Sequence, residues 1–217
     1  MGKEANRYLL LSRYPMPTSV RAALELAAHS HRSQKRKYDG APYIVHPIDV
    51  RNRLVSVMTG RVNGAMLNIM QQAALLHDVL EDTDCPEADI EKIDAETLRL
   101  VLELTDVSRP SDGNRAKRVA IDLAHFRKAS SAAQTIRMFD ISDNIDGIVD
   151  RDPDFAPKYL SEKRAVIAAA SRAHPAAVAY VDKIHAREVE ALRFLGKEPL
   201  CSRPASAEPN PTLSNAP

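Results

Sequence analysis

The sequence predicts an all-α fold, organised as a single helical bundle. Apolar residues recur at the three- and four-residue spacing of helices, and runs with the two-residue period of strands are almost absent. Aromatic residues make up only 5% of the chain, and there are 7 glycines. Strands joined by glycine-rich turns are therefore not expected, and every regular element is predicted as a helix.

The first elements follow from capping and turn residues. A helix is predicted at residues 18–30, capped by Thr18 or Ser19. A basic loop at residues 35–43 comes next. The dipeptide His46-Pro47 is then expected at the entrance of the second helix, because proline is well tolerated in the first helical turn.

The remaining helices are predicted from helical spacing and from the turn residues between them. The one that starts near Ala65 is expected to run through His77 and Asp78 and to end at residues 83–86. The last one closes the bundle. The predicted ranges are 47–58, 65–82, 87–93, 95–104, 115–126, 131–145, 157–173 and 175–195.

Length and charge limit the possible classes of protein. A chain of 217 residues forms one domain with tails. We expect an N-terminal extension at 1–17, the domain at 18–198 and a disordered tail at 199–217, where Ser, Pro, Ala and Asn dominate. Lys and Arg total 30 against 29 Asp and Glu. A net charge near zero gives no electrostatic reason to expect nucleic acid or an anionic membrane as partner, and nothing in the sequence fixes an oligomeric state.

Cysteines and apolar runs point to a cytoplasmic protein. Cys85 and Cys201 are far apart in the sequence and match no zinc-ligand spacing or disulfide framework. No apolar stretch approaches the roughly 18 residues of a membrane helix, and the N-terminus lacks a secretory core of sufficient length.

The most informative segment is His77-Asp78-Val79-Leu80-Glu81-Asp82, which directly follows an apolar run. At about 100° per residue, its four ionisable side chains fall within an arc of about 140° on one helical face. Charges beside a buried stretch cost several kcal/mol unless they are paired or bound to a metal. The segment therefore favours a cation site, and the alternative is a solvated, acidic helix end.

Further donors of the right kind lie elsewhere in the chain. His46, His77 and Asp78 offer the imidazole and carboxylate groups that hard or borderline divalent ions take. A fourth ligand is expected from a distant helix, and Asp140 stands in an otherwise apolar stretch. Asn144 follows one turn later and shares a face with Asp140.

These residues occur in an order that resembles a known family. The chain carries Pro-Tyr-x-x-His-Pro around His46, Ala-Ala-Leu-Leu-His-Asp-x-x-Glu-Asp-Thr at 73–83 and Asp-x-x-x-Asn at 140–144. Together they resemble the HD superfamily of metal-dependent phosphohydrolases and, more narrowly, the hydrolase domain of RelA/SpoT homologues. The resemblance runs from about residue 20 to residue 195 and implies a single HD-type helical bundle domain.

The resemblance implies a metal, usually Mn²⁺, held by His46, His77, Asp78 and Asp140. It also implies that Glu81 and Asp82 activate or orient the attacking water. Their chemistry suits this role, because two close carboxylates tend to split their pKa values and leave one able to act as a base.

The resemblance also implies contacts with a nucleotide substrate. Arg36 and Lys37 match a basic pair that meets the phosphates, although a solvated basic loop is the alternative. Asn144 matches a residue near the nucleotide, and Tyr159 matches a tyrosine near the sugar or base, with a packed tyrosine as the alternative. The chain departs from the family at Phe139 and at Ile141-Ser142, where a small residue and a basic residue are common.

The implied function is a guanosine-3′,5′-bis(diphosphate) 3′-pyrophosphohydrolase. Metal-activated water would convert (p)ppGpp to GDP or GTP and pyrophosphate. One alternative keeps the metal and changes the nucleotide to an adenosine alarmone or NADPH. The other is a nucleotide-binding module without turnover, and four intact ligand candidates argue against it.

Overall fold

The structure is a computed structural model, and it describes residues 16–197. Within this range it is built from helices, which confirms the all-α prediction, and the β-type pairing is one isolated bridge between Lys35 and Pro42. The predicted tail at 199–217 and residues 1–15 of the predicted extension lie outside the described residues. In order, the elements are α2 (Thr18–Ser30), α3 (Val45–Met58), α4 (Gly64–Leu76), α5 (Val79–Asp82), α6 (Glu87–Glu91), α7 (Ala95–Leu104), η2 (Pro110–Asp112), α8 (Arg115–Phe126), α9 (Ser131–Ile145), α10 (Ile148–Arg151), α11 (Ala156–Ala169) and α12 (Pro175–Phe194).

Side-chain caps explain where several helices begin. Asn63 accepts a hydrogen bond from the Met66 amide at the start of α4, and Asp94 accepts one from Thr97 at the start of α7. Ser130 caps α9 in the same way. Each cap satisfies an amide that the first helical turn leaves without a partner. The predicted cap of α2 is wrong, because Pro17 occupies the cap position and no side chain bonds the first turn.

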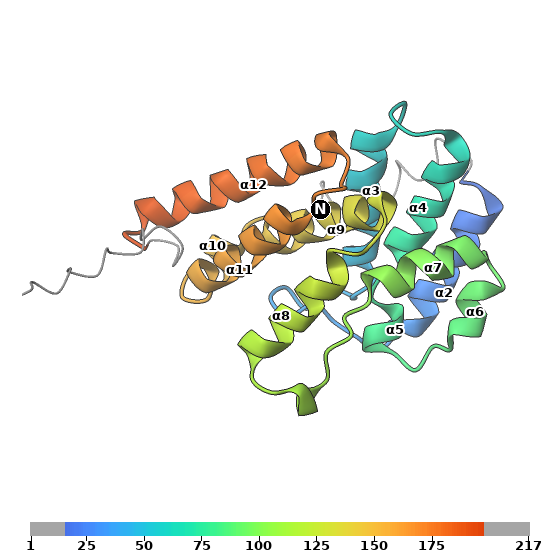
Figure 1. The fold of residues 1–217 in the computed structure, drawn as a ribbon, viewed down its shortest axis with the longest axis horizontal. Coiled ribbons are helices and arrows are strands. Elements are labelled where there is room, and N and C mark those ends of the chain that lie inside the picture. The colour runs from blue at the N-terminus through green and yellow to red at the C-terminus, as the bar shows by residue number, and fades with distance from the viewer. Residues whose placement is uncertain (1–15, 198–217) are drawn as a thin grey trace, which may run out of the picture.

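Helices α4 and α9 form the interior of the bundle. Helix α4 packs against α2, α3, α7 and α9, and α9 packs against α3, α7 and α12. Figure 1 shows α10, α11 and α12 on one side of α9, and α2, α6 and α7 on the other. Leu76, Ile136 and Phe139 are fully buried. The meeting point of α3, α4 and α9 is therefore shielded from solvent.

No helix among residues 16–197 is long and apolar enough to cross a membrane.

The predicted continuous helix through His77 and Asp78 is wrong. Helix α4 ends at Leu76, two turn residues follow, and α5 begins at Val79. His77 Nδ1 lies 2.9 Å from the Ala74 carbonyl oxygen. Because that carbonyl would otherwise accept the amide of Asp78, the side chain competes with the helical ladder and favours a break at this point.

Candidate metal centre and active site

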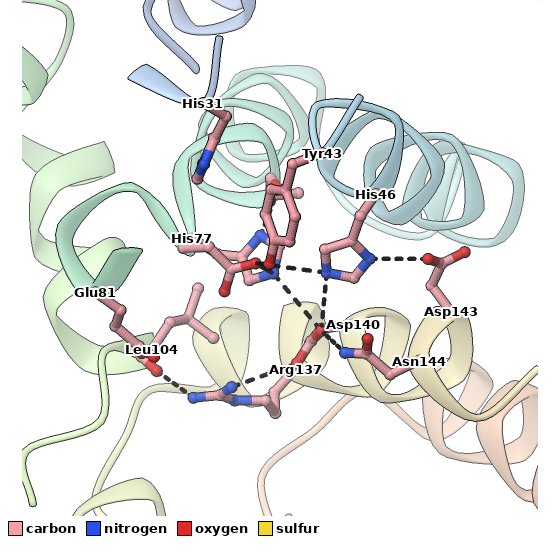
Figure 2. Close-up of polar contacts among 12 residues, drawn as sticks. His31, Tyr43, His46, His77, Glu81, Leu104, Arg137, Asp140, Asp143 and Asn144 are labelled. Carbon is pink, nitrogen blue, oxygen red and sulfur yellow. Dashed lines mark hydrogen bonds and ion pairs between the residues drawn. The ribbon is translucent and has the colours of Figure 1, made fainter. Parts of the chain in front are cut away.

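Three segments far apart in the sequence deliver the predicted metal donors. His46 lies in the first turn of α3, His77 and Asp78 form the break between α4 and α5, and Asp140 lies in α9. Figure 2 shows the side chains of His46, His77 and Asp140 directed toward one another. His46, His77, Asp78 and Asp140 are called the donor cluster below.

The donor atoms of the cluster lie close together. Asp140 Oδ1 is 3.3 Å from His46 Nε2 and 3.6 Å from His77 Nε2. Asp78 Oδ2 is 3.5 Å and 3.1 Å from the same two nitrogens. The donor atoms of His46, His77 and Asp140 all lie within 4.8 Å of one another. The structure thus brings the four predicted ligands to one point.

The cluster has the properties that a divalent metal requires. The side chains of His46, His77 and Asp140 are at most 5% exposed, and that of Asp78 is 15% exposed. His77 Nε2 is buried and has no hydrogen-bond partner among the described residues. A buried ring nitrogen without a partner is costly, and a lone pair directed at two carboxylates is what a cation would use. The residues therefore fit a divalent metal.

The second ring nitrogen of each imidazole, Nδ1, is held by a hydrogen-bond acceptor. His77 Nδ1 faces the Ala74 carbonyl, and His46 Nδ1 lies 2.8 Å from Asp143 Oδ2. Because these oxygens accept and do not donate, both Nδ1 atoms carry the proton and both Nε2 atoms are left toward the cluster.

The two carboxylates of the cluster are also held in place. Tyr43 donates its hydroxyl to Asp78 Oδ2 at 2.6 Å, and Asn144 donates to Asp140 Oδ1 at 2.6 Å. Arg137 reaches Asp140 Oδ2 at 3.3 Å. Burial raises the pKa of Asp140, but the close contacts with His46 and His77 and the positive charge of Arg137 outweigh it, so the net pKa lies well below the ordinary value. Asp140 is therefore held as a carboxylate.

The two predicted water-activating carboxylates lie on α5. Glu81 accepts a hydrogen bond from the Asp106 amide at 2.7 Å. Its side chain reaches solvent, yet the surrounding protein and the charge of Asp106 raise its pKa to about 7. Burial and the charge of Asp78 also raise the pKa of Asp82. These shifts leave both groups able to accept protons nearer neutral pH than an ordinary carboxylate can.

The predicted substrate residues are distributed unevenly. Arg36 pairs with Asp143 at 3.2 Å, and Asn144 touches the donor cluster directly. Lys37 has a 72% exposed side chain and lies 3.5 Å from Asp152. Tyr159 stacks on Phe155 and, with Arg137 and Lys163, lines a cavity of about 340 Å³ between α8 and α11.

Sequence reasoning missed three residues that support the donor cluster. Tyr43 stands in the Pro-Tyr-x-x-His-Pro motif, but the motifs assign it no role, and they assign none to Arg137 or Asp143. One signal was present, because Asp143 follows Asp140 by three residues and therefore shares a face of α9 with it.

The fold and the site define a class, namely helical domains that hold a divalent metal between histidines and aspartates. Within that class the family is shown by sequence. The chain belongs to the HD domain family, whose pattern matches residues 23–142.

Several characterised proteins are similar to this chain. The guanosine-3′,5′-bis(diphosphate) 3′-pyrophosphohydrolase MESH1 of Mus musculus is 45% identical over 86 residues, which is 39% of this chain and 45% of the mouse protein. MESH1 of Drosophila melanogaster is 37% identical over 124 residues, 56% of this chain and 65% of the fly protein. The guanosine-3′,5′-bis(diphosphate) 3′-pyrophosphohydrolase of Aquifex aeolicus is 31% identical over 144 residues, which is 64% of this chain and 19% of that protein.

A solved structure is similar over more of the chain. It is described as a metazoan ortholog of SpoT that hydrolyzes ppGpp and plays a role in starvation responses. The TM-score is 0.68 at 26% sequence identity, and the match covers 82% of this chain and 98% of the other. The likeness therefore extends beyond the segment that matches the family pattern.

Proposed function

We propose that this protein is a metal-dependent guanosine-3′,5′-bis(diphosphate) 3′-pyrophosphohydrolase, which converts (p)ppGpp to GDP or GTP and pyrophosphate. The observation that carries the proposal is the convergence of two buried imidazoles and two carboxylates on one point. The names and the extent of the similar proteins support the substrate class.

The proposal assigns His46, His77, Asp78 and Asp140 as metal ligands and Mn²⁺ as the metal. A bound divalent ion lowers the pKa of water and offsets the negative charge of a reacting phosphate. The chain's own contribution is a rigid donor set. Both imidazoles present Nε2, and Tyr43 and Asn144 fix one oxygen of each carboxylate.

Glu81 and Asp82 are proposed to manage the proton of the attacking water. In the reaction, the water oxygen forms a bond to a phosphorus of the 3′-diphosphate, the bond from that phosphorus to the ribose 3′-oxygen breaks, and pyrophosphate leaves. The water gives up a proton and the ribose oxygen takes one up. A carboxylate with a pKa of about 7, such as Glu81, suits proton transfer near neutral pH.

The nucleotide is proposed to lie along one side of the donor cluster. Arg36 can meet phosphate with two parallel hydrogen bonds, and Lys37 adds a mobile positive charge at the edge. Asn144 and Tyr159 would contact the nucleoside. The cavity that Tyr159 lines holds four basic side chains, Arg118 and Lys163 among them, against three acidic ones, and this small excess of positive charge supports an anionic ligand.

The test is a product assay on the full chain with Mn²⁺. The protein is incubated separately with ppGpp, with pppGpp, with the adenosine counterparts of these two nucleotides and with NADPH. The products are identified by anion exchange and mass spectrometry. We expect pyrophosphate and GDP or GTP. Release of phosphate from NADPH with the guanosine substrates left intact would overturn the proposed substrate.

Two variants control the assay. Asp78→Ala removes a proposed ligand and should abolish turnover and metal retention together. Asp150→Ala changes an exposed carboxylate of α10 and should turn over ppGpp like the unchanged protein. Full activity in Asp78→Ala would contradict the assigned site.

A further inference from the structure

Asp143 is a buried carboxylate that the proposed reaction does not use. It lies one turn after Asp140 on α9, and its side chain is only 4% exposed. Three cationic or donor groups surround it. His46 Nδ1 is 2.8 Å from Oδ2, Arg36 Nη2 is 3.2 Å from the same oxygen, and Arg53 Nη2 is 3.1 Å from Oδ1.

This environment keeps Asp143 charged and immobile. A buried carboxylate is tolerated only when it is paired and hydrogen-bonded, and two guanidinium groups supply the pairing here. Both carboxylate oxygens are engaged, so the side chain has one orientation. The acceptor offered to His46 is therefore a fixed, negatively charged oxygen.

The two imidazoles of the donor cluster differ in the kind of acceptor that holds Nδ1. His77 is held by a backbone carbonyl, which no substitution at Ala74 removes. His46 is held by a side chain, and a charged acceptor makes the opposite nitrogen a stronger electron donor than a neutral one does. The properties of one imidazole thus depend on a residue outside the cluster.

We propose that Asp143 is the positioning residue of His46, fixing the proton on Nδ1 and presenting Nε2 to the metal, and that it also anchors Arg36 beside the site. The inference rests on the proposed metal site. Because Oδ2 is shared, one carboxylate sets the geometry of a metal ligand and of a phosphate-binding guanidinium.

The variant test compares two neighbouring aspartates. Asp143→Asn keeps the shape and removes the charge. Asp146→Asn is the matched control, because Asp146 pairs with the same Arg53 at 2.8 Å and with Arg187, and not with His46. Mn²⁺ dissociation constants are measured on the full chains without nucleotide, together with melting temperatures. We expect roughly 10- to 100-fold weaker binding in Asp143→Asn and a change below about twofold in Asp146→Asn.

Two results of this comparison would overturn the inference. One is an Mn²⁺ affinity of Asp143→Asn within about twofold of the unchanged protein. The other is an equal loss in both variants, which would show a general effect of the end of α9. If Asp143→Asn binds Mn²⁺ weakly and the unchanged protein binds it well but leaves ppGpp intact, the proposed substrate fails while the role of Asp143 is supported.

A second measurement needs no variant. Nitrogen NMR of the histidine side chains in the unchanged protein, with diamagnetic Mg²⁺ in place of Mn²⁺, reports which ring nitrogen carries the proton. We expect the proton of His46 on Nδ1. A proton on Nε2 would contradict the positioning role even if Asp143→Asn did not fold.

Discussion

The donor cluster and the outer edge of the site are built by opposite means. Each member of the cluster comes from a packed helix or a helix break, is largely buried and is held by at least one further contact. The proposed edge, formed by Lys37, Tyr38 and Asp152 and called the rim below, is exposed at Lys37 and Tyr38 and half-buried at Asp152. Its contacts include the 2.9 Å hydrogen bond from the Tyr38 hydroxyl to Asp152, the 3.5 Å ion pair of Lys37 with Asp152 and the 3.1 Å hydrogen bond from Lys37 to the Tyr38 hydroxyl.

This difference separates what is fixed from what can adapt. Moving a donor of the cluster requires moving a helix, and interiors packed to crystal-like density resist such shifts. The rim is held by exposed pairs that are each worth at most about 1 kcal/mol. We therefore expect changes in the cluster to affect metal binding and rate, and changes in the rim to affect substrate affinity alone.

The largest effect is expected from Asp140→Asn. The substitution keeps the shape of a side chain that lies 3.3 Å and 3.6 Å from the two imidazole nitrogens, but removes its charge. We expect Mn²⁺ retention and turnover to fall to background, as measured by metal analysis of the purified protein and by product release. Asp150→Asn, which changes an exposed carboxylate, serves as the control. Retained metal in Asp140→Asn would remove Asp140 from the ligand set.

Glu81→Gln is expected to separate rate from metal binding. The side chain is proposed to take up a proton, and loss of a general base costs about 10²- to 10⁴-fold in rate. The Mn²⁺ dissociation constant should stay close to that of the unchanged protein, since Glu81 is not a proposed ligand. Steady-state kinetics and metal titration check both parts. Equal losses of metal and rate would instead make Glu81 part of the metal site.

Tyr43→Phe is expected to weaken Mn²⁺ binding, although Tyr43 is not a proposed ligand. The lost hydroxyl donates to Asp78 at 2.6 Å, and loss of such a support typically costs 10- to 100-fold in metal affinity. Because Asp78 itself keeps both carboxylate oxygens, we expect the lower end, about 10-fold, in an Mn²⁺ titration. Tyr38→Phe removes a hydroxyl from the rim and should leave Mn²⁺ affinity unchanged. Equal Mn²⁺ affinities in the two variants would contradict the proposed difference between cluster and rim.

The rim predicts a smaller effect that is confined to substrate affinity. Lys37→Gln removes one exposed charge, so KM for ppGpp should rise about two- to fivefold and kcat should stay constant. The increase should shrink at high salt, because exposed charges are screened. Lys92→Gln is the control, since the side chain of Lys92, the residue after α6, is 74% exposed, like the 72% of Lys37. A fall in kcat would place Lys37 at the reacting phosphate rather than at the rim.

Local sequence signals predicted the regular helices well. The bounds 95–104, 115–126 and 131–145 are confirmed for α7, α8 and α9, whose first amides are capped by Asp94, Asn114 and Ser130. Capping depends on residues within one turn, so the sequence contains the information. The fold class follows from the same local periodicity.

Features that depend on distant partners could not be predicted. Helix α10 was missed because its start is stabilised by Glu188, a residue of α12 that accepts bonds from the amides of Gly147 and Val149. The break at His77 depends on an imidazole turned back onto Ala74. Asp143 was missed for the same reason, since His46 and Arg36 lie about a hundred residues earlier in the chain.

The smallest effect expected is a pH dependence of stability in the metal-free protein. The pKa of Glu81 is raised from 4.5 to about 7 in the folded state, so its ionised form is disfavoured there. Relative to Glu81→Gln, the unchanged protein should lose stability as pH rises from about 4.5 to about 7, and the difference should stay constant at higher pH. Because the side chain reaches solvent, we expect a difference of only about 1–3 °C in melting temperature.

Glu96→Gln is expected to change stability in the opposite direction to Glu81→Gln. Its hydrogen bond to Arg99 lowers the pKa of Glu96, so the ionised form is favoured in the folded state, and replacement should cost stability above pH 4.5 instead of gaining it. Melting curves in a chelator at a series of pH values test both variants. The same sign in both would mean that the crowded setting of Glu81 beside Asp106 does not disfavour its charge, and Glu81 would then lack the near-neutral pKa that its proposed role as a base requires.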